Sequence, residues 1–383
     1  MEELELRIDS LAAGGDGVGR DASGRVVFVP GTAPGDRVRV RIEKARARFA
    51  RAQLQELLEP GPSRVEPRCS VFGRCGGCAW QHVDYPTQLE AKRRILSDAL
   101  RRIGGIRELP LSHFAGSPQP YAYRLRARLH VEGGRVGYRQ RASQALCAID
   151  ACPVLLPELE ARLGELASRP PDRDGEWELA AAGGEVRAAP LGDEASFAAP
   201  LALEVAGERL HFSTGVFAQA NALLLETLVR RVCEALGSGG QLVELFAGSG
   251  LFTLPLSRRF GSVVAVEGHA AAARDLEANL AAAGRANVRV LSKRVEDAGP
   301  GLSGIAPDAL LLDPPRVGLP AGGLGLIGEL APQRLAYLSC DPATLARDLR
   351  GLQERGYGLV GVEGFDLFPQ TPHVEALAVM ERV

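Results

Sequence analysis

From about Gly240 onward, the 383-residue chain alternates short apolar segments with amphipathic ones. The candidate strands are 242–245, 263–266, 288–291, 309–312 and 335–338, with helices expected between them, for example at 270–283 and 343–355. Strands that alternate with helices are typical of a parallel sheet that carries helices on both faces. The pattern therefore predicts a doubly wound α/β domain in the C-terminal part of the chain.

The first sixty residues indicate strands and turns. Arginine alternates with Val or Ile over 37–42, which gives this strand one apolar and one basic face. Residues 26–29 form a second candidate strand, and clusters at 14–17 and 34–36 mark turns. Several short strands in so few residues predict a small OB-like barrel, a fold that commonly binds RNA.

A third region separates the barrel from the α/β domain. The linker 59–62, Glu-Pro-Gly-Pro, ends the barrel, and we expect domains at 1–60, 61–210 and 211–383. In the central domain, a helix is predicted near 88–103. A strand over 123–131 is predicted to turn back into 135–139 as a hairpin.

The composition excludes several classes of protein. The net charge of −2 and the apolar share of 46% are ordinary for a globular protein, and they exclude a disordered chain, collagen and a coiled coil. No apolar run approaches the roughly 18 residues of a membrane span, and the N-terminus lacks the features of a secretion signal. Seven cysteines are an odd number at low density, which favours metal binding or catalysis over disulfides. We therefore expect a cytoplasmic protein with no membrane partner.

The basic residues are concentrated in two segments. Residues 37–51 contain seven basic side chains and one acid, and residues 121–141 contain six basic side chains and one acid. Such segments indicate a nucleic-acid partner, although a pair of solvated strand faces would have the same pattern.

A glycine turn follows the first strand of the α/β domain. Phe246 leads into Gly248 and Gly250, where the backbone can pass close to a ligand. Glu267 ends the next strand, where a carboxylate can accept hydrogen bonds from ribose hydroxyls. Thr253 replaces the third glycine of a dinucleotide site, so the pattern favours S-adenosylmethionine over NAD, or else a glycine turn that only packs.

Three further positions carry candidate chemistry. Asp313, in Asp-Pro-Pro-Arg316, follows an apolar strand and is expected at the carboxyl edge of the sheet, where ligands bind. Cys340 leaves the next strand at the same edge, and a thiolate that adds to C6 of uracil makes C5 a nucleophile. Glu375 is the candidate base for the C5 proton, because apolar neighbours can raise its pKa. Read alone, Cys340 fits a core position, and Glu375 and His373 fit structural roles.

A group of cysteines precedes the central helix. Cys69, Cys75 and Cys78 lie within ten residues, with glycines that let the loop fold around a metal group. The fourth ligand is Cys147 or Cys152, and the spacing leaves zinc and an iron–sulfur cluster equally open.

Taken together, these motifs resemble the S-adenosylmethionine-dependent RNA uracil-C5 methyltransferases, and in the family's order they span nearly the whole chain. The matching segments are Phe217-Ala-Gln219-x-Asn221, Glu244-Leu-Phe-Ala-Gly-Ser-Gly250, Val266-Glu267-Gly268, Asp313-Pro-Pro-Arg316, Ser339-Cys340-Asp341-Pro342-Ala-Thr-Leu-Ala-Arg347-Asp348 and 368–375. The resemblance implies a class I methyltransferase domain, preceded by a TRAM-like barrel typical of the ribosomal RNA members.

The resemblance also implies roles for single residues. Cys340 would be the nucleophile, Glu375 the base, and the cofactor contacts would be Gln219, Phe246, Gly248, Gly250, Glu267 and Asp313. The ribosomal RNA members hold a [4Fe-4S] cluster, which implies Cys69, Cys75, Cys78 and Cys152 as its ligands here, because a distant Cys-Pro matches Cys152-Pro153. Asp341 departs from the family, since many members carry Asn at this position.

The predicted function is methyl transfer from S-adenosylmethionine to C5 of a uridine in RNA, most consistent with 23S ribosomal RNA; no protein partner is implied. Three alternatives stay open. They are a tRNA uridine-C5 methyltransferase, an amino-group methyltransferase that uses the Asp313-Pro-Pro loop, and a non-catalytic iron–sulfur RNA-binding protein.

Overall fold

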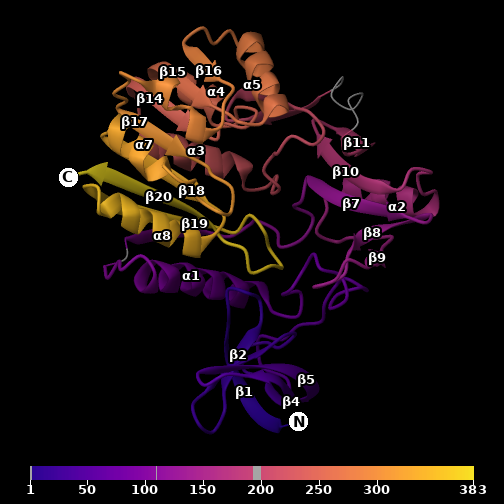
Figure 1. Cartoon of the computed structure of the whole chain (residues 1–383). Helices are drawn as coiled ribbons and strands as arrows, with labels where there is room; N and C mark the ends of the chain where they lie inside the picture. Colours follow the sequence, from indigo (N-terminus) through magenta and orange to yellow (C-terminus); the bar gives the residue numbers. More distant parts are fainter. Residues whose placement is uncertain (1, 109, 193–199) are drawn as a thin grey trace.

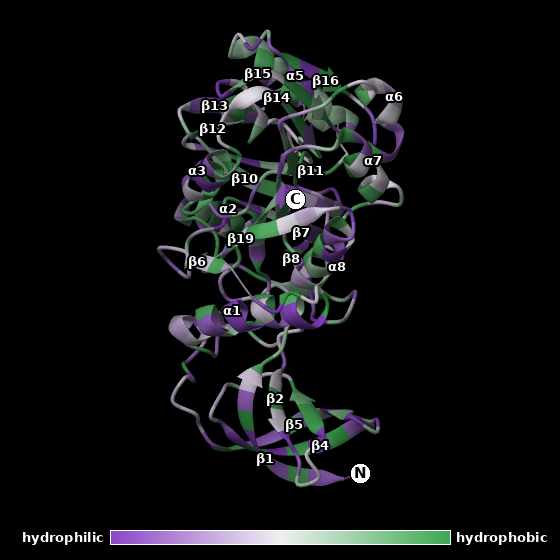
Figure 2. Cartoon of the chain, turned by 90° about the vertical axis from the view of Figure 1, so that its left-hand side faces the viewer, coloured by the Kyte–Doolittle hydropathy of each residue, from purple (hydrophilic) through white to green (hydrophobic). Residues whose placement is uncertain are grey.

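The computed structural model describes residues 2–108, 110–192 and 200–383. Its three parts are a small barrel at the N-terminus, a central β domain and a larger α/β domain (Figure 1). The long helix α1 (Tyr85–Arg102) lies between the barrel and the α/β domain, as the view turned by 90° also shows (Figure 2). None of the helices in the described ranges is long and apolar enough to cross a membrane.

The barrel closes in the strand order β1-β2-β3-β5-β4. Its strands are β1 (Glu3–Leu11), β2 (Gly17–Arg20), β3 (Val26–Val29), β4 (Arg37–Ala45) and β5 (Phe49–Glu59). Val38 and Val40 are fully buried, as the alternation along β4 predicts. A separate apolar core fills the barrel, so it is a packed unit of its own.

On the outward face of β4, two of the basic side chains are paired with acidic ones. Arg37 forms ion pairs with Glu5 and Glu59, and Arg39 pairs with Glu5 and Glu56 on the neighbouring strands. Cross-strand neighbours of opposite charge stabilise a sheet, so these two arginines have a local structural role.

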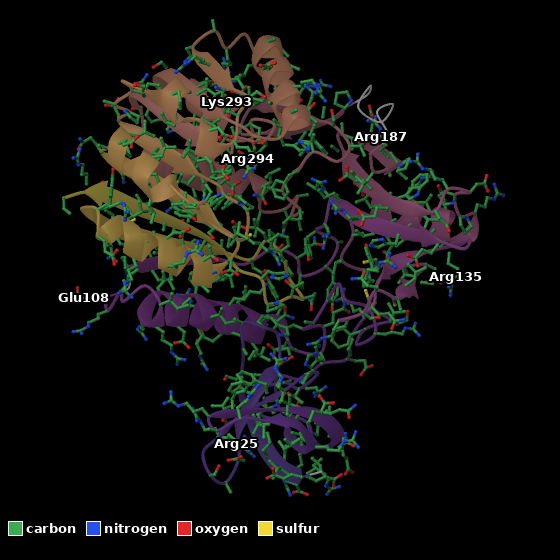
Figure 3. The ribbon with its side chains drawn as sticks, viewed as in Figure 1. Arg25, Glu108, Arg135, Arg187, Lys293 and Arg294 are labelled. Atoms are coloured by element: carbon green, nitrogen blue, oxygen red, sulfur yellow. The ribbon has the colours of Figure 1, made fainter. Side chains whose placement is uncertain are left out.

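The central domain is an antiparallel sheet in the order β11-β10-β7-β8-β9, covered by helix α2 (Pro157–Ser168). The strands are β7 (Arg126–Glu132), β8 (Arg135–Arg139), β9 (Leu146–Ala148), β10 (Gly175–Ala182) and β11 (Glu185–Pro190), with a separate hairpin of β12 (Leu201–Val205) and β13 (Glu208–Phe212). The predicted hairpin turn is present, and Gly133 and Gly134 both have positive φ. Arg135 lies on the outer rim of this domain, so the second basic segment is spread over different surfaces (Figure 3).

The α/β domain holds an eight-stranded sheet in the order β16-β15-β14-β17-β18-β20-β19-β6. The strands are β6 (Leu111–Ala115), β14 (Gly239–Leu245), β15 (Phe260–Val266), β16 (Val288–Leu291), β17 (Ala309–Leu312), β18 (Arg334–Ser339), β19 (Tyr357–Phe365) and β20 (Glu375–Arg382). The helices are α3 (Leu225–Leu236), α4 (Thr253–Ser257), α5 (Ala270–Ala282), α6 (Gly299–Leu302), α7 (Gly323–Leu330) and α8 (Pro342–Gln353), with a short 3₁₀ turn at Val295–Asp297.

The sheet is mixed, whereas the sequence pattern predicts a parallel one. The strands from β16 to β18 are parallel, but β20 runs antiparallel to both of its neighbours. The reason is the connection from β19 to β20, a loop over 366–374. Such a loop is too short for the crossover that parallel strands need.

Two elements from the expected central segment 61–210 belong to the α/β layer. Strand β6 pairs with β19 at the edge of the large sheet, and α1 packs against α8. Helix α1 begins where Asp84 accepts a hydrogen bond from the Thr87 amide, with Pro86 in the first turn. Its apolar face, which includes Leu96 and Leu100, joins the core of the sheet.

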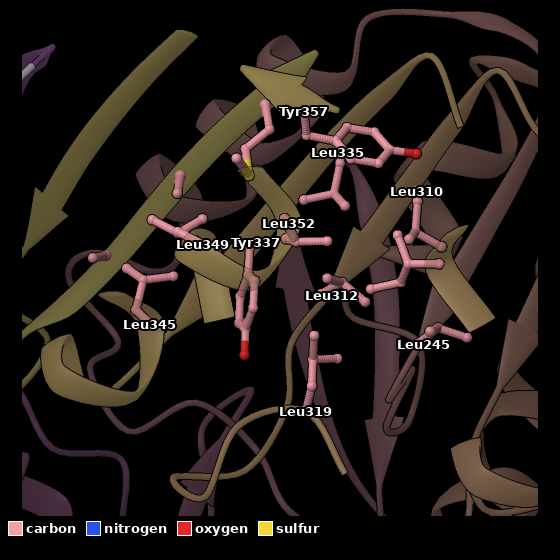
Figure 4. Close-up of a cluster of buried hydrophobic side chains, with 14 of the residues drawn as sticks. Leu245, Leu310, Leu312, Leu319, Leu335, Tyr337, Leu345, Leu349, Leu352 and Tyr357 are labelled. Carbon is pink, nitrogen blue, oxygen red and sulfur yellow. The ribbon is translucent and has the colours of Figure 1, made fainter. Parts of the chain in front are cut away.

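That core covers one face of the sheet completely. Leu245, Leu310 and Leu312 from the central strands pack against leucines of α8 (Figure 4). The Tyr337 hydroxyl, buried in the same cluster, donates to Asp348 of α8 over 2.7 Å. On the other face, α3 packs on the sheet in a second apolar cluster. The sheet is thus rigid from both sides, and its carboxyl edge is a fixed platform.

Candidate active site

The glycine turn after β14 has the backbone that its sequence predicts. Phe246, Gly248 and Gly250 all have positive φ, at 66°, 57° and 99°. A Cβ on Gly250 would lie 2.6 Å from a methyl group of Leu276 on α5, so a side chain is excluded there. No atom lies within 4 Å of a Cβ built on Gly248. Gly248 therefore faces open space, and Gly250 packs behind the turn.

Glu267, at the end of β15, is fixed by this turn. Its carboxylate accepts hydrogen bonds from the Gly248 amide (2.7 Å) and the His269 amide (2.6 Å). Each carboxylate oxygen has a second lone pair, so Glu267 can still accept from two ribose hydroxyls.

A cavity of about 710 Å³ opens above the carboxyl edge of the sheet. It brings together the predicted residues Gln219, Phe246, Gly248, Glu267, Asp313, Cys340 and Glu375. Gly250 does not line it, in keeping with its packing role. The cavity is also lined by Phe217, Leu251, His269, Arg316 and Phe368, which had no assigned role. The size and the mix of apolar walls with a few polar groups suit a nucleoside-sized ligand.

Two acidic groups in this cavity hold protons more tightly than usual. Burial raises the pKa of Asp313 to about 7. Burial, together with the nearby charge of Asp313, raises the pKa of Glu375 well above its ordinary value, while Arg316 opposes the shift. A carboxylate with a raised pKa is a stronger base, which suits Glu375 for removing a proton from carbon.

Cys340 and Glu375 lie at the same end of neighbouring strands. The last pair of the β18–β20 ladder joins Ser339 and Ala376. Next to this pair, at the same end of the ladder, lie Cys340, which comes after Ser339, and Glu375, which comes before Ala376. Burial raises the pKa of the Cys340 thiol to about 11, with a further contribution from the charge of Glu375. The positive charge of Arg316 lowers the pKa of the thiol and so favours the thiolate.

Cys340 also lines a second cavity on the opposite side. This cavity, of about 630 Å³, lies between the barrel, α1 and the turns after β18 and before β20. Its basic and aromatic lining residues are Arg20, Phe28, Arg48, Phe49, Arg94 and Arg102. Cys340 is therefore shared by two cavities, one nucleoside-sized with mainly apolar walls and the other lined by arginines.

The neighbour of Cys340, Asp341, has a structural partner. Its carboxylate accepts a hydrogen bond from the Thr344 amide over 2.8 Å and caps the N-terminus of α8. The positive end of the helix dipole stabilises a negative charge at this position. The departure from the family's Asn therefore keeps the cap.

His373 acts as a hydrogen-bonded loop residue. Its Nε2 lies 3.2 Å from a guanidinium nitrogen of Arg316. Burial, and then the charge of Arg316, lowers the pKa of His373 to about 4, so the imidazole is neutral and can accept from the guanidinium. This contact places Arg316 beside Cys340.

The predicted metal ligands gather at one place. Cys69, Cys75, Cys78 and Cys152 line a cavity of about 150 Å³ in the central domain. Cys147 is buried in β9 within the apolar core and does not line this cavity. Cys233, on the inner face of α3, is buried in the second apolar cluster, as expected.

The local chemistry of this cysteine site fits a metal group. Burial raises the pKa of Cys75 to about 11 and that of Cys78 to about 12, and neighbouring thiols add to both shifts. The Gly77 amide donates to the Cys75 sulfur (3.4 Å) and the Tyr138 hydroxyl to the Cys152 sulfur (3.9 Å). A bound metal would turn these costly buried thiols into stable thiolates.

Both candidate metal groups are bound by thiolates, in different arrangements. Zinc needs its four thiolates around one point, at about 2.3 Å from the ion. A four-iron cluster binds each cysteine to a different iron. The cysteine site supplies four sulfurs around one cavity, which suits either group.

Comparisons with known proteins show which family the chain belongs to. Residues 200–383 match the family described as tRNA (Uracil-5-)-methyltransferase, and residues 1–55 match the TRAM domain. An uncharacterized RNA methyltransferase of Synechocystis sp. is 36% identical, over 99% of this chain and 96% of its own length. The 23S rRNA (uracil(1939)-C(5))-methyltransferase RlmD of Alkalilimnicola ehrlichii is 36% identical, over 100% and 97%. The chain belongs to the family of RNA uracil-C5 methyltransferases.

A solved member confirms the fold of this methyltransferase. The crystal structure of Pyrococcus abyssi tRNA (uracil-54, C5)-methyltransferase in complex with S-adenosyl-L-homocysteine has a TM-score of 0.76 and 23% identity, and it covers 98% of this chain and 100% of its own. The barrel is thus a TRAM domain, and the enzyme is an S-adenosylmethionine-dependent RNA (uracil-C5)-methyltransferase.

Some site residues give no signal in the sequence. His269 lines the 710 Å³ cavity, but a lone histidine after a strand has no recognisable pattern. Arg316 belongs to the Asp-Pro-Pro-Arg motif, so the motif points to the loop. The role of the guanidinium beside Cys340 depends on the fold.

Proposed function

We propose that the enzyme methylates C5 of an unpaired uridine in 23S ribosomal RNA, through a covalent bond between Cys340 and C6 of the base. The observation that carries this proposal is the position of Cys340, which lines both the 710 Å³ cofactor cavity and the 630 Å³ basic cavity. A thiol there meets a base that enters from the barrel side while the methyl donor lies on the other side.

The residues of the chain then have separate tasks. The Cys340 thiolate forms a bond to C6, and the electrons of the C5–C6 double bond move toward C5 and the C4 carbonyl. S-adenosylmethionine supplies the methyl group that C5 takes up. Glu375 removes the C5 proton, the double bond re-forms, and the C6–S bond breaks to return the thiolate. Arg316 favours the thiolate before addition and after release.

The basic cavity suits an RNA segment around the target base. Four arginines from the barrel and α1 line it, and Phe28 and Phe49 form an edge-to-face pair with ring centroids 6.2 Å apart. Phosphates bind arginines, and unpaired bases stack on aromatic rings. The target uridine has to leave its stack to reach Cys340.

Ribosomal RNA as the substrate is supported by full-length similarity to relatives named as 23S rRNA methyltransferases. A tRNA uridine is the second candidate, because the solved member with the same fold is named as a tRNA methyltransferase.

We propose further that Cys69, Cys75, Cys78 and Cys152 hold a [4Fe-4S] cluster that stabilises the fold. The position of these four cysteines around one cavity supports this ligand set. Methyl transfer exchanges no electrons with the protein, so no redox step is assigned to the cluster. Cluster ligation by thiolates suits the reducing cytoplasm.

The test uses anaerobically purified enzyme, methyl-labelled S-adenosylmethionine, and unmodified 23S rRNA and tRNA in separate reactions. Products are digested to nucleosides. Label in 5-methyluridine from 23S rRNA supports the proposal, and label only from tRNA would establish the second candidate. Label on an exocyclic amino group would reveal an amino-group methyltransferase. Absence of label with bound RNA would reveal a non-catalytic binding protein.

A further inference from the structure

The loop over 366–374 joins β19 to β20 and passes beside both cavities. Phe368 lines the cofactor cavity, while His373 lines the basic cavity. The loop ends at Glu375, the first residue of β20. Contacts that hold this loop in place therefore also hold the Glu375 carboxylate in place relative to the target uracil.

Gln370, in the middle of the loop, is held by a residue of α1 that is distant in sequence. The Gln370 amide donates to the side-chain oxygen of Gln88 (2.9 Å), and the Gln88 side-chain nitrogen donates back to the side-chain oxygen of Gln370 (2.9 Å). The Gln88 nitrogen also donates to the carbonyls of Trp80 and Val83. Gln88 and Gln370 are both buried, with exposed fractions of 0% and 2%.

The segment that follows the cysteine site also contacts Gln370. The backbone amides of Ala79 and Trp80 both donate to the Gln370 carbonyl, at 2.9 and 3.0 Å. These two residues directly follow the proposed cluster ligand Cys78. Gln370, in the loop over 366–374, is thus connected to both α1 and the cysteine site.

The backbone of Gln370 shows that these contacts determine its conformation. Its φ is 68°, in the left-handed region that favours glycine. For a residue with a side chain, this conformation is energetically unfavourable because Cβ approaches the backbone. A strained residue persists only where its surroundings over-determine it, and such residues concentrate at functional sites.

Two further anchors hold the loop from the same side. The buried Lys92 ammonium pairs with the buried Asp366 carboxylate, and it donates to the Phe368 carbonyl over 2.9 Å. The Tyr123 hydroxyl donates to the Pro369 carbonyl over 2.9 Å. These contacts end on Asp366, Phe368 and Pro369, in the loop that leads to Glu375, and not on Cys340.

We propose that Gln88 and Gln370 are positioning residues that set the Glu375 carboxylate against the C5 proton. This inference rests on the proposed role of Glu375 as the base. If their contacts are removed, Cys340 stays at the end of β18, and the glycine turn with Glu267 in the cofactor cavity keeps its own hydrogen bonds. Addition to C6 and methylation of C5 then continue, while proton removal and release of the thiolate become slow. The methylated RNA accumulates as a covalent adduct on Cys340.

The experiment measures the denaturant-stable protein–RNA adduct and the rate of product release with labelled cofactor. The variants are Gln88→Ala and Gln370→Gly; the second keeps the backbone bonds and accepts positive φ, so it tests the amide pair without backbone strain. We expect release to fall on the order of 10-fold to 100-fold, as for a displaced catalytic group, with the adduct several-fold more abundant. Cofactor affinity and the KM for RNA should stay unchanged.

Three reference variants make the outcome decisive. Gln353→Ala removes an exposed glutamine at the end of α8 and should behave as wild type. Gln370→Asn tolerates the left-handed conformation and should recover part of the release rate if the side-chain amide matters. Glu375→Gln should accumulate the adduct most strongly.

The results separate the inference from the proposed function. If Glu375→Gln forms no adduct, the role of Glu375 is wrong and the inference fails with it. If Glu375→Gln forms the adduct while Gln88→Ala and Gln370→Gly lose addition and release equally, in step with a lower Tm, these residues only stabilise the fold. Unchanged release in both variants would also overturn the inference.

Discussion

Cys340 directly follows Ser339 and Glu375 directly precedes Ala376, and Ser339 and Ala376 are the last pair of the antiparallel β18–β20 ladder, so Cys340 and Glu375 lie at the same edge of the sheet. The antiparallel direction of β20 makes this possible, because the start of β20 meets the carboxyl end of β18. Because β18 and β20 are hydrogen-bonded to each other, the distance between the proposed nucleophile Cys340 and the proposed base Glu375 can change little. The sheet thus holds the two reacting groups more firmly than loops would.

The first prediction concerns the nucleophile. Cys340→Ala should reduce 5-methyluridine formation below detection, at least about 1,000-fold, because C5 of uracil is not nucleophilic without addition at C6. The matched control is Cys233→Ala, a buried cysteine outside both cavities, which should keep activity. Isothermal titration with S-adenosyl-L-homocysteine should give the same affinity for both variants. Retained methylation in Cys340→Ala would contradict the covalent mechanism.

The second prediction is a pH dependence. Both the Cys340 thiol (pKa about 11) and the Glu375 carboxyl have raised pKa values, and each acts in its deprotonated form. Deprotonation increases with pH, so kcat/KM should rise from about pH 7 to about pH 9, up to about tenfold per unit. Arg316 lowers both pKa values; Arg316→Ala should therefore move the rise to higher pH.

The control for this shift is Arg350→Ala on the exposed face of α8, whose profile should match wild type. A profile that falls with pH, or that does not move in Arg316→Ala, would show that neither group limits the reaction.

Much of the architecture was predictable because it depends on local patterns. Strands 288–291 and 309–312 are found with the same bounds, and Glu375 begins β20. The glycine turn and Glu267 could be recognised in the sequence because glycine lets the backbone pass close to a ligand and a carboxylate can accept hydrogen bonds from ribose hydroxyls. The strand expected at 335–338 placed Cys340 at the same edge, and the family resemblance then implied its role.

Other features depend on contacts between distant segments. The Gln88–Gln370 pair joins residues 282 positions apart, and neither glutamine has a local pattern that marks it. The pairing of Arg37 and Arg39 with glutamates on β1 and β5 likewise depends on how the barrel closes. A single strand sequence shows its basic face but not the acids opposite it.

The third prediction separates the cysteines. Cys78→Ser should lose bound iron and sulfide, because Cys78 lines the cysteine site, whereas Cys147→Ser should keep both. Chemical analysis of anaerobically purified variants measures this difference. Since Ala79 and Trp80 hold the Gln370 carbonyl, amide hydrogen exchange over 366–375 should also increase in Cys78→Ser. Equal iron loss in Cys147→Ser would show that Cys147 is a ligand.

The fourth prediction tests the path of the RNA. Arg48 and Arg94 line the basic cavity from the barrel and from α1, so Arg48→Ala and Arg94→Ala should each weaken RNA binding. Each should reduce the slope of log Kd against log salt by about 1, the value for one lost phosphate contact. Arg37→Ala is the matched control in the same barrel, because Glu5 and Glu59 already neutralise Arg37. If Arg37→Ala weakens binding as much as Arg48→Ala, the RNA follows the outer face of the barrel rather than the cavity that leads to Cys340.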